Sequence, residues 1–316
     1  MPVAAPATPA RVRQAVAGGL DYLTDMGLTW KAERQCASCH HVPVMLWALG
    51  EARGAGFSVD ETVAAEFTSW SLAADGAAKV VATEGTPSAA VYSLAAVYTT
   101  LGVSARPEAD AATREGLGRM AAYIVSRQQE DGSWAGPDGR PPLFDQPEVI
   151  TMLSVLALSS PALRDDPAQP QYAAARDKAL AWLSANAPGD GHQALVLRLL
   201  AAIAAARSPD ELRPLVDDLL ARQSADGGWR QTPDMASDAF ATGQSVYALR
   251  GAGIPTDDPA MRAGAAFLVN SQSADGSWPM KSRPNPSTGT PGANLAPITF
   301  TGTAWGVIGL ARGAQE

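Results

Sequence analysis

A seven-residue pattern, Gln-x-x-Asp-Gly-x-Trp, occurs three times in this chain of 316 residues. The copies are QQEDGSW at 128–134, QSADGGW at 223–229 and QSADGSW at 272–278. Each copy follows a stretch of helical apolar periodicity and precedes another, which indicates a repeating helix pair. The Asp-Gly step predicts the turn between the two helices, because glycine accepts positive φ and aspartate bonds the local backbone.

Weaker copies of the pattern extend the repeat to six units. Asp75-Gly76 and Asp190-Gly191 occupy the turn position in two of them, and the first unit keeps only a helix and Trp30. We predict outer helices at about 10–25, 58–73, 107–128, 170–186, 209–222 and 258–271. We predict inner helices at about 43–54, 87–102, 147–160, 192–206, 237–251 and 300–312.

Six helix pairs can close into an all-α (α/α)6 toroid, because closure buries the apolar face that no single pair can bury alone. We therefore expect a disordered tail at 1–9 and a single barrel domain over 10–316. The inner stretches are rich in Ala and Gly, and their few large side chains are candidates for the cavity wall: Trp47, Tyr92, Tyr247 and Trp305. The segment 279–299 has no helical pattern and is expected to cap or cross the barrel.

The repeated motif resembles the QW-type repeat of the squalene–hopene cyclase and prenyltransferase superfamily, whose domains are (α/α)6 barrels. The resemblance implies that the Gln and Trp of each copy tie neighbouring helix pairs together. Class II terpene cyclases in this superfamily protonate an alkene with an Asp-x-Asp-Asp motif at the start of an inner helix. Here that place holds Asp238, preceded by Met235 and Ser237. Asp238 is a catalytic candidate, and its structural alternative is a helix N-cap.

Chemically active side chains gather where the inner helices are expected to begin. In a parallel ring these N-termini lie at one end, and their positive partial charge favours an anionic group. All three histidines and both cysteines fall on this predicted rim, together with Glu148 and Asp238. We predict Glu148 as a second catalytic candidate, with a first-turn residue that complements the helix dipole as the alternative.

The stretch CASCHH at 36–41 contains the only two cysteines of the chain. Cys-x-x-Cys-His is the signature of c-type haem attachment. It predicts haem c bound covalently through Cys36 and Cys39, with His40 as the proximal iron ligand. His192 is the preferred sixth ligand, and His41 and Met45 are the other candidates.

Zinc is the rival cofactor at this motif. Two thiolates at Cys-x-x-Cys spacing and one or two histidines make a plausible tetrahedral set: Cys36, Cys39 and His40, completed by His192 or Asp238. Prenyltransferase β subunits and lanthipeptide cyclases also hold zinc inside a similar toroid. The remaining alternative is a loop whose cysteines are free or form a redox disulfide.

Composition excludes several classes of function. With 24 Lys and Arg against 32 Asp and Glu, the net charge of −8 leaves no basic surface for nucleic acid. The apolar segments fall short of the roughly 18 uninterrupted residues of an integral membrane helix. Residues 1–10 lack the pattern of a signal peptide.

Three functions remain open at the level of sequence. The preferred one is an exported or periplasmic toroid with haem at one barrel mouth. It would serve electron transfer with a redox protein partner or oxidation of a hydrophobic, isoprenoid-like molecule. The alternative is a zinc- or carboxylate-dependent enzyme like a terpene cyclase or prenyltransferase, cytoplasmic if no haem is attached. The third is a non-catalytic toroid that binds a hydrophobic ligand or a protein.

Overall fold

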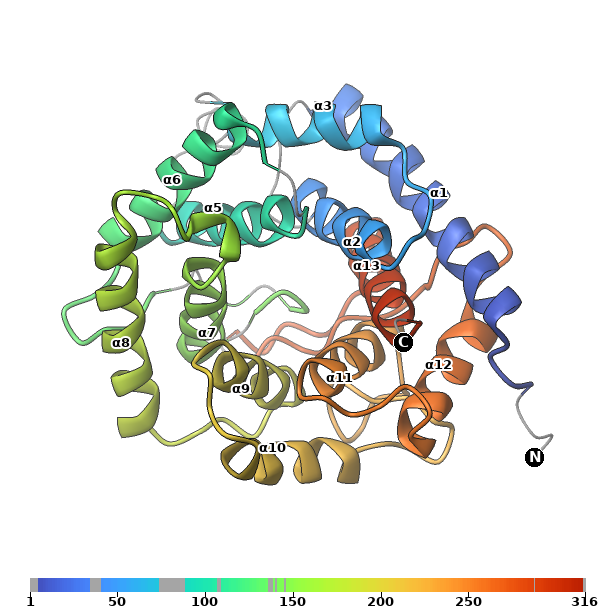
Figure 1. Cartoon of the computed structure of the whole chain (residues 1–316). Coiled ribbons are helices and arrows are strands. Elements are labelled where there is room, and N and C mark those ends of the chain that lie inside the picture. Colours follow the sequence, from blue (N-terminus) through green and yellow to red (C-terminus); the bar gives the residue numbers. More distant parts are fainter. Residues whose placement is uncertain are drawn as a thin grey trace.

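The computed structural model describes residues 5–34, 41–73, 89–106, 109–135, 139, 141–144, 146–286 and 288–314. These residues form two concentric rings of helices (Figure 1). The outer ring contains α1 (Pro9–Arg34), α3 (Glu61–Leu72), α6 (Ala111–Ser126), α8 (Gln169–Ala185), α10 (Pro209–Ala221) and α12 (Pro259–Ser271). The inner ring contains α2 (Val42–Gly54), α5 (Ala89–Ser104), α7 (Pro147–Leu158), α9 (His192–Ala204), α11 (Ala239–Gly251) and α13 (Ala296–Gly313). The predicted all-α toroid of helix pairs is confirmed.

The inner ring closes on itself. Each inner helix packs against the next along the chain, and α13 packs against both α11 and α2. Outer and inner helices alternate in sequence, so the inner helices share one direction and their C-terminal ends meet at one mouth of the barrel (Figure 1). Closure between the first and last repeats gives every inner helix two inner neighbours and an outer cover.

Several outer helices begin at a side chain that caps the free backbone amides of the first turn. Asp110 accepts a hydrogen bond of 2.7 Å from the amide of Thr113 at the start of α6. Ser208 and Glu211 form a reciprocal capping box at the start of α10. These caps fix where the helices start, whereas the apolar face determines how they pack.

The tryptophans of the three strong repeats anchor the turns between outer and inner helices. Each is almost fully buried. Each indole Nε1 donates to a carbonyl of its own outer helix, and each backbone amide donates to a threonine of the following inner helix. The indole bonds are Trp134 to Ile124 (2.7 Å), Trp229 to Leu219 (2.8 Å) and Trp278 to Leu268 (2.8 Å); the threonines are Thr151, Thr242 and Thr303.

The glutamines of the same repeats join one repeat to the next. Gln128 donates 2.8 Å to Ala175 on α8, and Gln223 donates 2.8 Å to Ala260 on α12. Gln272 donates 2.8 Å to Ala15 on α1 and thereby links the last repeat to the first. The Gln and Trp of the motif therefore occupy the linking positions that the resemblance implies.

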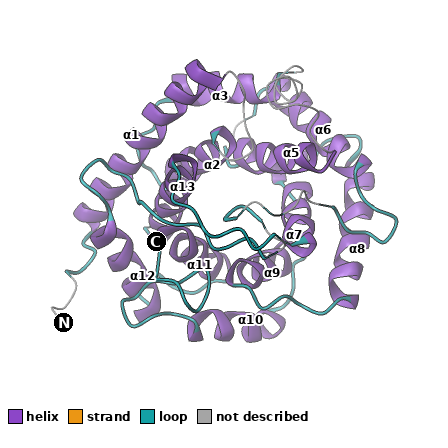
Figure 2. Ribbon diagram, turned by 180° about the vertical axis from the view of Figure 1, so that it is seen from behind, coloured by secondary structure: helices purple, strands orange, loops and turns teal. Residues whose placement is uncertain are grey.

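The segment 279–295, here called the strap, runs across the N-terminal ends of the inner helices (Figure 2). It connects Trp278 to α13, which begins at Ala296, about one turn earlier than predicted. Arg283 of the strap is buried and bonds Pro142 and Gln231, which belong to two neighbouring connections. Within the part of the chain that the structure describes, no helix has the length and apolar character to cross a membrane.

Candidate active site

A pocket of about 760 Å³ lies at the C-terminal ends of the inner helices, and we call it the central pocket. All six inner helices contribute to its wall. Among the lining residues are Trp47, Glu51, Leu101, Ser104, Leu156, Leu200, Tyr247 and Arg312. Its volume lies within the range of small-molecule sites. The sequence placed the functional rim at the N-terminal ends, so this pocket is at the opposite mouth from the one expected.

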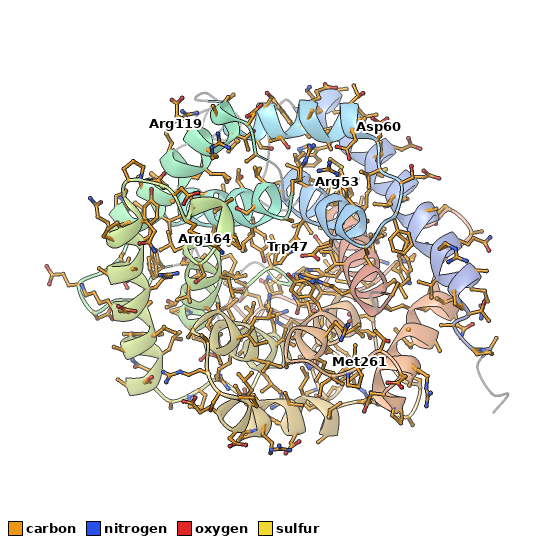
Figure 3. The ribbon with its side chains drawn as sticks, in the orientation of Figure 1. Trp47, Arg53, Asp60, Arg119, Arg164 and Met261 are labelled. Atoms are coloured by element: carbon orange, nitrogen blue, oxygen red, sulfur yellow. The ribbon has the colours of Figure 1, made fainter. Side chains whose placement is uncertain are left out.

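Three aromatic rings pack edge to face beside the central pocket. The ring centroids of Trp47 and Trp305 are 5.0 Å apart, and the centroid of the Tyr247 ring is 5.9 Å from each of them. Trp47 points toward the middle of the inner ring (Figure 3). Trp47 and Tyr247 line the cavity, as the sequence predicts. Trp305 is not among the lining residues and instead packs against both of these rings. The side chain of Tyr92 lies outside the described part of the chain.

Glu51 is a buried carboxyl group within this aromatic set. Its Oε1 accepts 3.0 Å from the Tyr247 hydroxyl and 3.3 Å from Trp47 Nε1, while Oε2 lies 2.8 Å from Arg312 Nε. Burial raises the pKa of Glu51 above its ordinary value, and the ion pair with Arg312 and the hydrogen bonds counteract part of that rise. We call Glu51, Arg312, Trp47, Tyr247 and Trp305 the carboxyl–aromatic cluster.

Arg312 completes this cluster from the last turn of α13. Its guanidinium carbon lies 5.1 Å from the centroid of the Tyr247 ring, in cation–π geometry. Burial and the neighbouring Glu51 carboxylate raise the pKa of Tyr247, so the phenol keeps its proton. The cluster therefore joins α2, α11 and α13 and holds a titratable carboxyl group at the pocket wall.

Asp238 stands at the other end of the barrel, where the sequence predicted it. It is the N-cap of α11: Oδ1 accepts 2.9 Å from the Ala241 amide, and Oδ2 accepts 2.8 Å from Gln231 Nε2. Burial raises the pKa of Asp238 to about 6, against the lowering effect of these donors. The contacts of Asp238 are those of a helix N-cap, the structural alternative to a catalytic role. Asp238 does not line the central pocket.

The strap covers Asp238 through Gln231 and Arg283. Gln231 donates 2.7 Å to the Lys281 carbonyl and accepts 3.0 Å from the Arg283 amide. The Arg283 guanidinium donates to the Pro142 carbonyl at 3.2 Å and to Gln193 Oε1. This network fastens the strap over the N-terminal ends of the inner helices.

His192 is the first residue of α9, also at this end of the barrel. Its Nε2 lies 2.9 Å from the Ser245 hydroxyl and 3.3 Å from the Ala241 carbonyl, both on α11. Burial lowers the pKa of His192 to about 4, so the ring is neutral at pH 7. Nε2 of His192, one of the two ring nitrogens that could bind a metal, therefore already contacts Ser245 and Ala241 of α11.

Glu148 lies in the first turn of α7 and faces the α8–α9 connection. Both of its carboxylate oxygens accept 3.1 Å from the Gly189 amide, and Oε1 lies 3.4 Å from Arg198. Glu148, His192 and Asp238 all occupy the predicted N-terminal rim, but each has its own partners. None of the described contacts joins any two of these three side chains.

Cys36, Cys39 and His40 lie outside the described residues. Next to them, His41 is buried and stacks between two rings, with centroid distances of 3.9 Å to Trp30 and 4.5 Å to Phe300. Among the described residues, no group of three or more His, Cys, Asp or Glu side chains is arranged to hold a metal ion. The haem and zinc assignments therefore stay predictions.

A second pocket, of about 820 Å³, lies between the start of α9 and the α10–α11 connection. Arg222 and Arg230 line it, but both have partners within the chain. Arg222 bonds Asp218 and the Asp190 carbonyl, and Arg230 bonds Ser224. We prefer the central pocket as the site, because it brings a buried carboxyl group and the aromatic side chains of Trp47 and Tyr247 to one wall.

Sequence reasoning missed Glu51 and Arg312. Both lie in the last turns of inner helices, in the similar stretches LGEARG (49–54) and GLARG (309–313), where a charged residue on an otherwise apolar inner helix is a signal. It also missed Gln231 and Arg283, because the bonds of Gln231 to the strap and of Arg283 to Gln193 join segments about 50 or more residues apart in sequence.

Comparison with known proteins agrees with the fold. A family model described as the squalene-hopene cyclase N-terminal domain matches residues 180–277. Copalyl diphosphate synthase from Streptomyces cyslabdanicus is 45% identical over 62 residues, which are 20% of this chain and 12% of that protein. The match thus spans a small part of the synthase.

Solved structures resemble nearly the whole chain. The unsaturated glucuronyl hydrolase from Bacillus sp. GL1 superposes with a TM-score of 0.58 and 14% identity, covering 95% of this chain and 96% of that chain. A glycosidase variant gives a TM-score of 0.58 with 11% identity, covering 97% and 98%. At these identities the likeness shows the shared toroid fold alone.

Proposed function

We propose that this chain, which has the α/α toroid fold and resembles the squalene-hopene cyclase N-terminal domain over residues 180–277, acts on an isoprenoid-like molecule held in the central pocket. The reaction is an acid-initiated cyclisation. The observation that carries this proposal is Glu51, a buried carboxyl group that shares a pocket wall with Trp47 and Tyr247.

The chemistry follows from the surroundings of Glu51. Burial raises the pKa of Glu51, and when protonated this carboxyl group can transfer its proton to an alkene carbon. The carboxylate left behind is stabilised by Arg312 and by the Tyr247 hydroxyl. The carbocation formed on the substrate would be stabilised by the face of an aromatic ring in the pocket wall, which carries the negative end of the ring quadrupole. Loss of a proton from the cyclised cation returns the acid, so the product of cyclisation is an isomer of the substrate.

Asp238 is the competing acid, because the resemblance places the proton donor at the start of an inner helix. Its raised pKa suits an acid. Both oxygens of Asp238 accept hydrogen bonds, as do both oxygens of Glu51. Glu51 is preferred as the proton donor because it lines the central pocket, which Asp238 does not.

The test is incubation of the purified protein with squalene, geranylgeraniol and geranylgeranyl diphosphate, followed by mass spectrometry of extracted products. We expect a cyclic isomer of one substrate, abolished by Glu51→Gln and retained by Asp238→Asn. The reverse pattern would assign the acid to Asp238. Absence of both product and binding with the wild-type protein would exclude the proposed function.

The second candidate is a haem protein of the same fold, exported to the periplasm, and the motif CASCH supports it. Haem c on Cys36 and Cys39, with His40 as iron ligand, would supply electron transfer. His192 serves as a sixth ligand only if Nε2 leaves Ser245, or through its other ring nitrogen. The test is a pyridine haemochrome spectrum of protein exported in a host with cytochrome c maturation, beside a Cys36→Ala, Cys39→Ala control. A colourless product excludes haem, and metal analysis of that product tests zinc.

A further inference from the structure

Three serines line the central pocket: Ser104, the last residue of α5, and Ser159 and Ser160, which follow α7. Two of them use their hydroxyl groups within the chain. Ser159 Oγ donates 2.7 Å to the Val155 carbonyl. Ser160 Oγ accepts 3.1 Å from the Ala162 amide. Ser104 Oγ, in contrast, is buried and has no hydrogen-bond partner among the described residues.

The missing partner of Ser104 stands out on its own helix. Thr100, one turn earlier on α5, donates 2.8 Å to the Ala96 carbonyl. Ser104 makes no equivalent bond to the Thr100 carbonyl. A buried polar atom without a partner has lost its bonds to water and gained none in return. Because the Ser104 side chain turns about a single bond, a ligand in the pocket can supply the missing partner without movement of the helix.

Ser104 lies between an apolar part of the pocket wall and the pocket mouth. Leucines from three inner helices line the pocket: Leu101, Leu156 and Leu200. Leu101 precedes Ser104 by one turn of α5. Since all the inner helices run toward this mouth (Figure 1), the leucine lies deeper than the serine. A ligand with an apolar chain and one polar group would therefore place its chain against the leucines and its polar group near Ser104.

The wall beside Ser104 also carries Glu51, the proposed proton donor. Ala105 contacts α2 so closely that a Cβ on Gly50 would lie 2.6 Å from the Ala105 Cβ. Ser104 precedes Ala105 and Glu51 follows Gly50, and both line the central pocket. Ser104 and Glu51 thus flank one contact between α2 and the end of α5.

The charges of this wall favour a neutral polar group. Two arginines line the pocket, and each already bonds a carboxylate. Arg106 lies 2.9 Å from Glu61, and Arg312 lies 2.8 Å from Glu51. An anionic group would have to compete with these carboxylates, whereas a neutral group at Ser104 leaves both ion pairs in place.

We propose that Ser104 hydrogen-bonds a hydroxyl group of the substrate beside Glu51, while the apolar chain of the substrate lies against the leucines. Two hydroxyl groups can pair in either direction, because each both donates and accepts. This inference rests on the proposed function and narrows its substrate class to an isoprenoid alcohol that enters chain first and keeps its hydroxyl group toward the pocket mouth.

The test compares geranylgeraniol with the hydrocarbon in which hydrogen replaces its hydroxyl group. Binding is measured by quenching of tryptophan fluorescence, since Trp47 lines the pocket. We expect the wild-type protein to bind the alcohol roughly 3- to 10-fold more tightly, the effect of one neutral hydrogen bond. In Ser104→Ala we expect the two affinities to become equal. Ser159→Ala is the matched control and should keep the preference for the alcohol, because its hydroxyl group is already bonded to Val155.

Stability of the ligand-free variants provides a second readout. Ser104→Ala removes no hydrogen bond and should unfold at the same or a higher urea concentration than the wild-type protein. Ser159→Ala removes one and should unfold at a lower urea concentration. An equal loss in both variants would contradict an unpartnered Ser104 and overturn the inference.

Geranylgeranyl diphosphate is the third probe, and we expect it to bind no more tightly than the alcohol. Tighter binding of the diphosphate would overturn the assignment of a neutral group. Equal wild-type affinities for alcohol and hydrocarbon would overturn the role of Ser104 and leave the proposed function standing. Failure to bind any of the three molecules would overturn the proposed function itself.

Discussion

The Tyr247 hydroxyl on α11 donates a 3.0 Å hydrogen bond to Glu51 on α2, 196 residues away in sequence. The helix between them in the ring is α13, which adds Arg312 to the same carboxylate. One carboxyl group thus receives donors from three inner helices at the seam where the first and last repeats meet.

Tyr247→Phe should destabilise the protein by about 1 kcal/mol, because it removes one hydrogen bond without leaving a buried charge unpaired. Urea unfolding measures the loss, and a double-mutant cycle with Glu51→Gln should show coupling because both changes affect one contact. Tyr172→Phe is the matched control, since Tyr172 also bonds a carboxylate, Asp166, but away from the central pocket. Ligand affinity should fall in Tyr247→Phe and not in Tyr172→Phe; equal effects would contradict a role of the seam in binding.

Asp238 and His192 should change the free energy of unfolding in opposite directions with pH, over nearly the same pH range. The folded-state pKa of Asp238 is raised to about 6, so its contribution is greatest below about pH 4 and is lost as pH rises through 6. The folded-state pKa of His192 is lowered to about 4, so stability falls as pH drops from about 6.5 toward 4.

Urea unfolding between pH 4 and 7 separates these two contributions. Compared with the wild-type protein, Asp238→Asn should lose more stability on acidification, and His192→Asn should lose less. Only the change in the free energy of unfolding with pH is compared, because each substitution also alters that free energy by an amount that does not depend on pH. Parallel slopes in all three proteins would show that neither group has the folded-state pKa given above.

Gln272→Leu should release α1 from the ring. It removes the donor to the Ala15 carbonyl and to the Gly276 carbonyl, and we expect a loss of about 1–3 kcal/mol. Hydrogen exchange should quicken within 9–34, because that helix loses its link to the last repeat. Gln223→Leu removes the equivalent bond to α12 and is the control: it should cost a similar amount but leave exchange in 9–34 unchanged.

Gly243→Ala should prevent the close approach of α11 and α13. A Cβ at this position would lie 2.0 Å from a backbone oxygen, which cannot move aside as a flexible side chain can. We expect a loss of several kcal/mol or failure to fold, visible as a lower melting temperature or insoluble protein. Gly54→Ala is the control, since among the described residues no atom beyond its own turn of helix lies within 4 Å of its Cβ position, and it should stabilise α2 by about 0.4–1 kcal/mol.

The fold was predictable because its signal is local and repeated. Gln-x-x-Asp-Gly-x-Trp identified the turn of each strong repeat, and apolar periodicity placed both helices around it. The outer α10 and α12 begin within a residue of their predicted positions. The largest error is at the end of α1, which continues to Arg34 beyond the predicted end near 25.

The candidate site was predictable only in part. The sequence placed Trp47 and Tyr247 at the cavity wall, because large side chains are rare on Ala- and Gly-rich inner helices. It did not find Glu51, whose importance depends on partners in α11 and α13. It also directed attention to the N-terminal rim, because it predicts that 279–299 caps or crosses the barrel but does not say which mouth that segment covers.

The sequence by itself therefore determined the number of helix pairs, their order and the residues that link them, because each unit is built from contacts within a few turns of chain. Only the tertiary structure decided which mouth of the barrel holds the pocket and which buried groups face it. Those outcomes depend on ring closure, which brings Glu51 to Tyr247 and Arg312, and on the strap, which brings Arg283 to Gln193 and Gln231. Contacts between residues so far apart in sequence arise from the closed geometry and are not encoded in any local pattern.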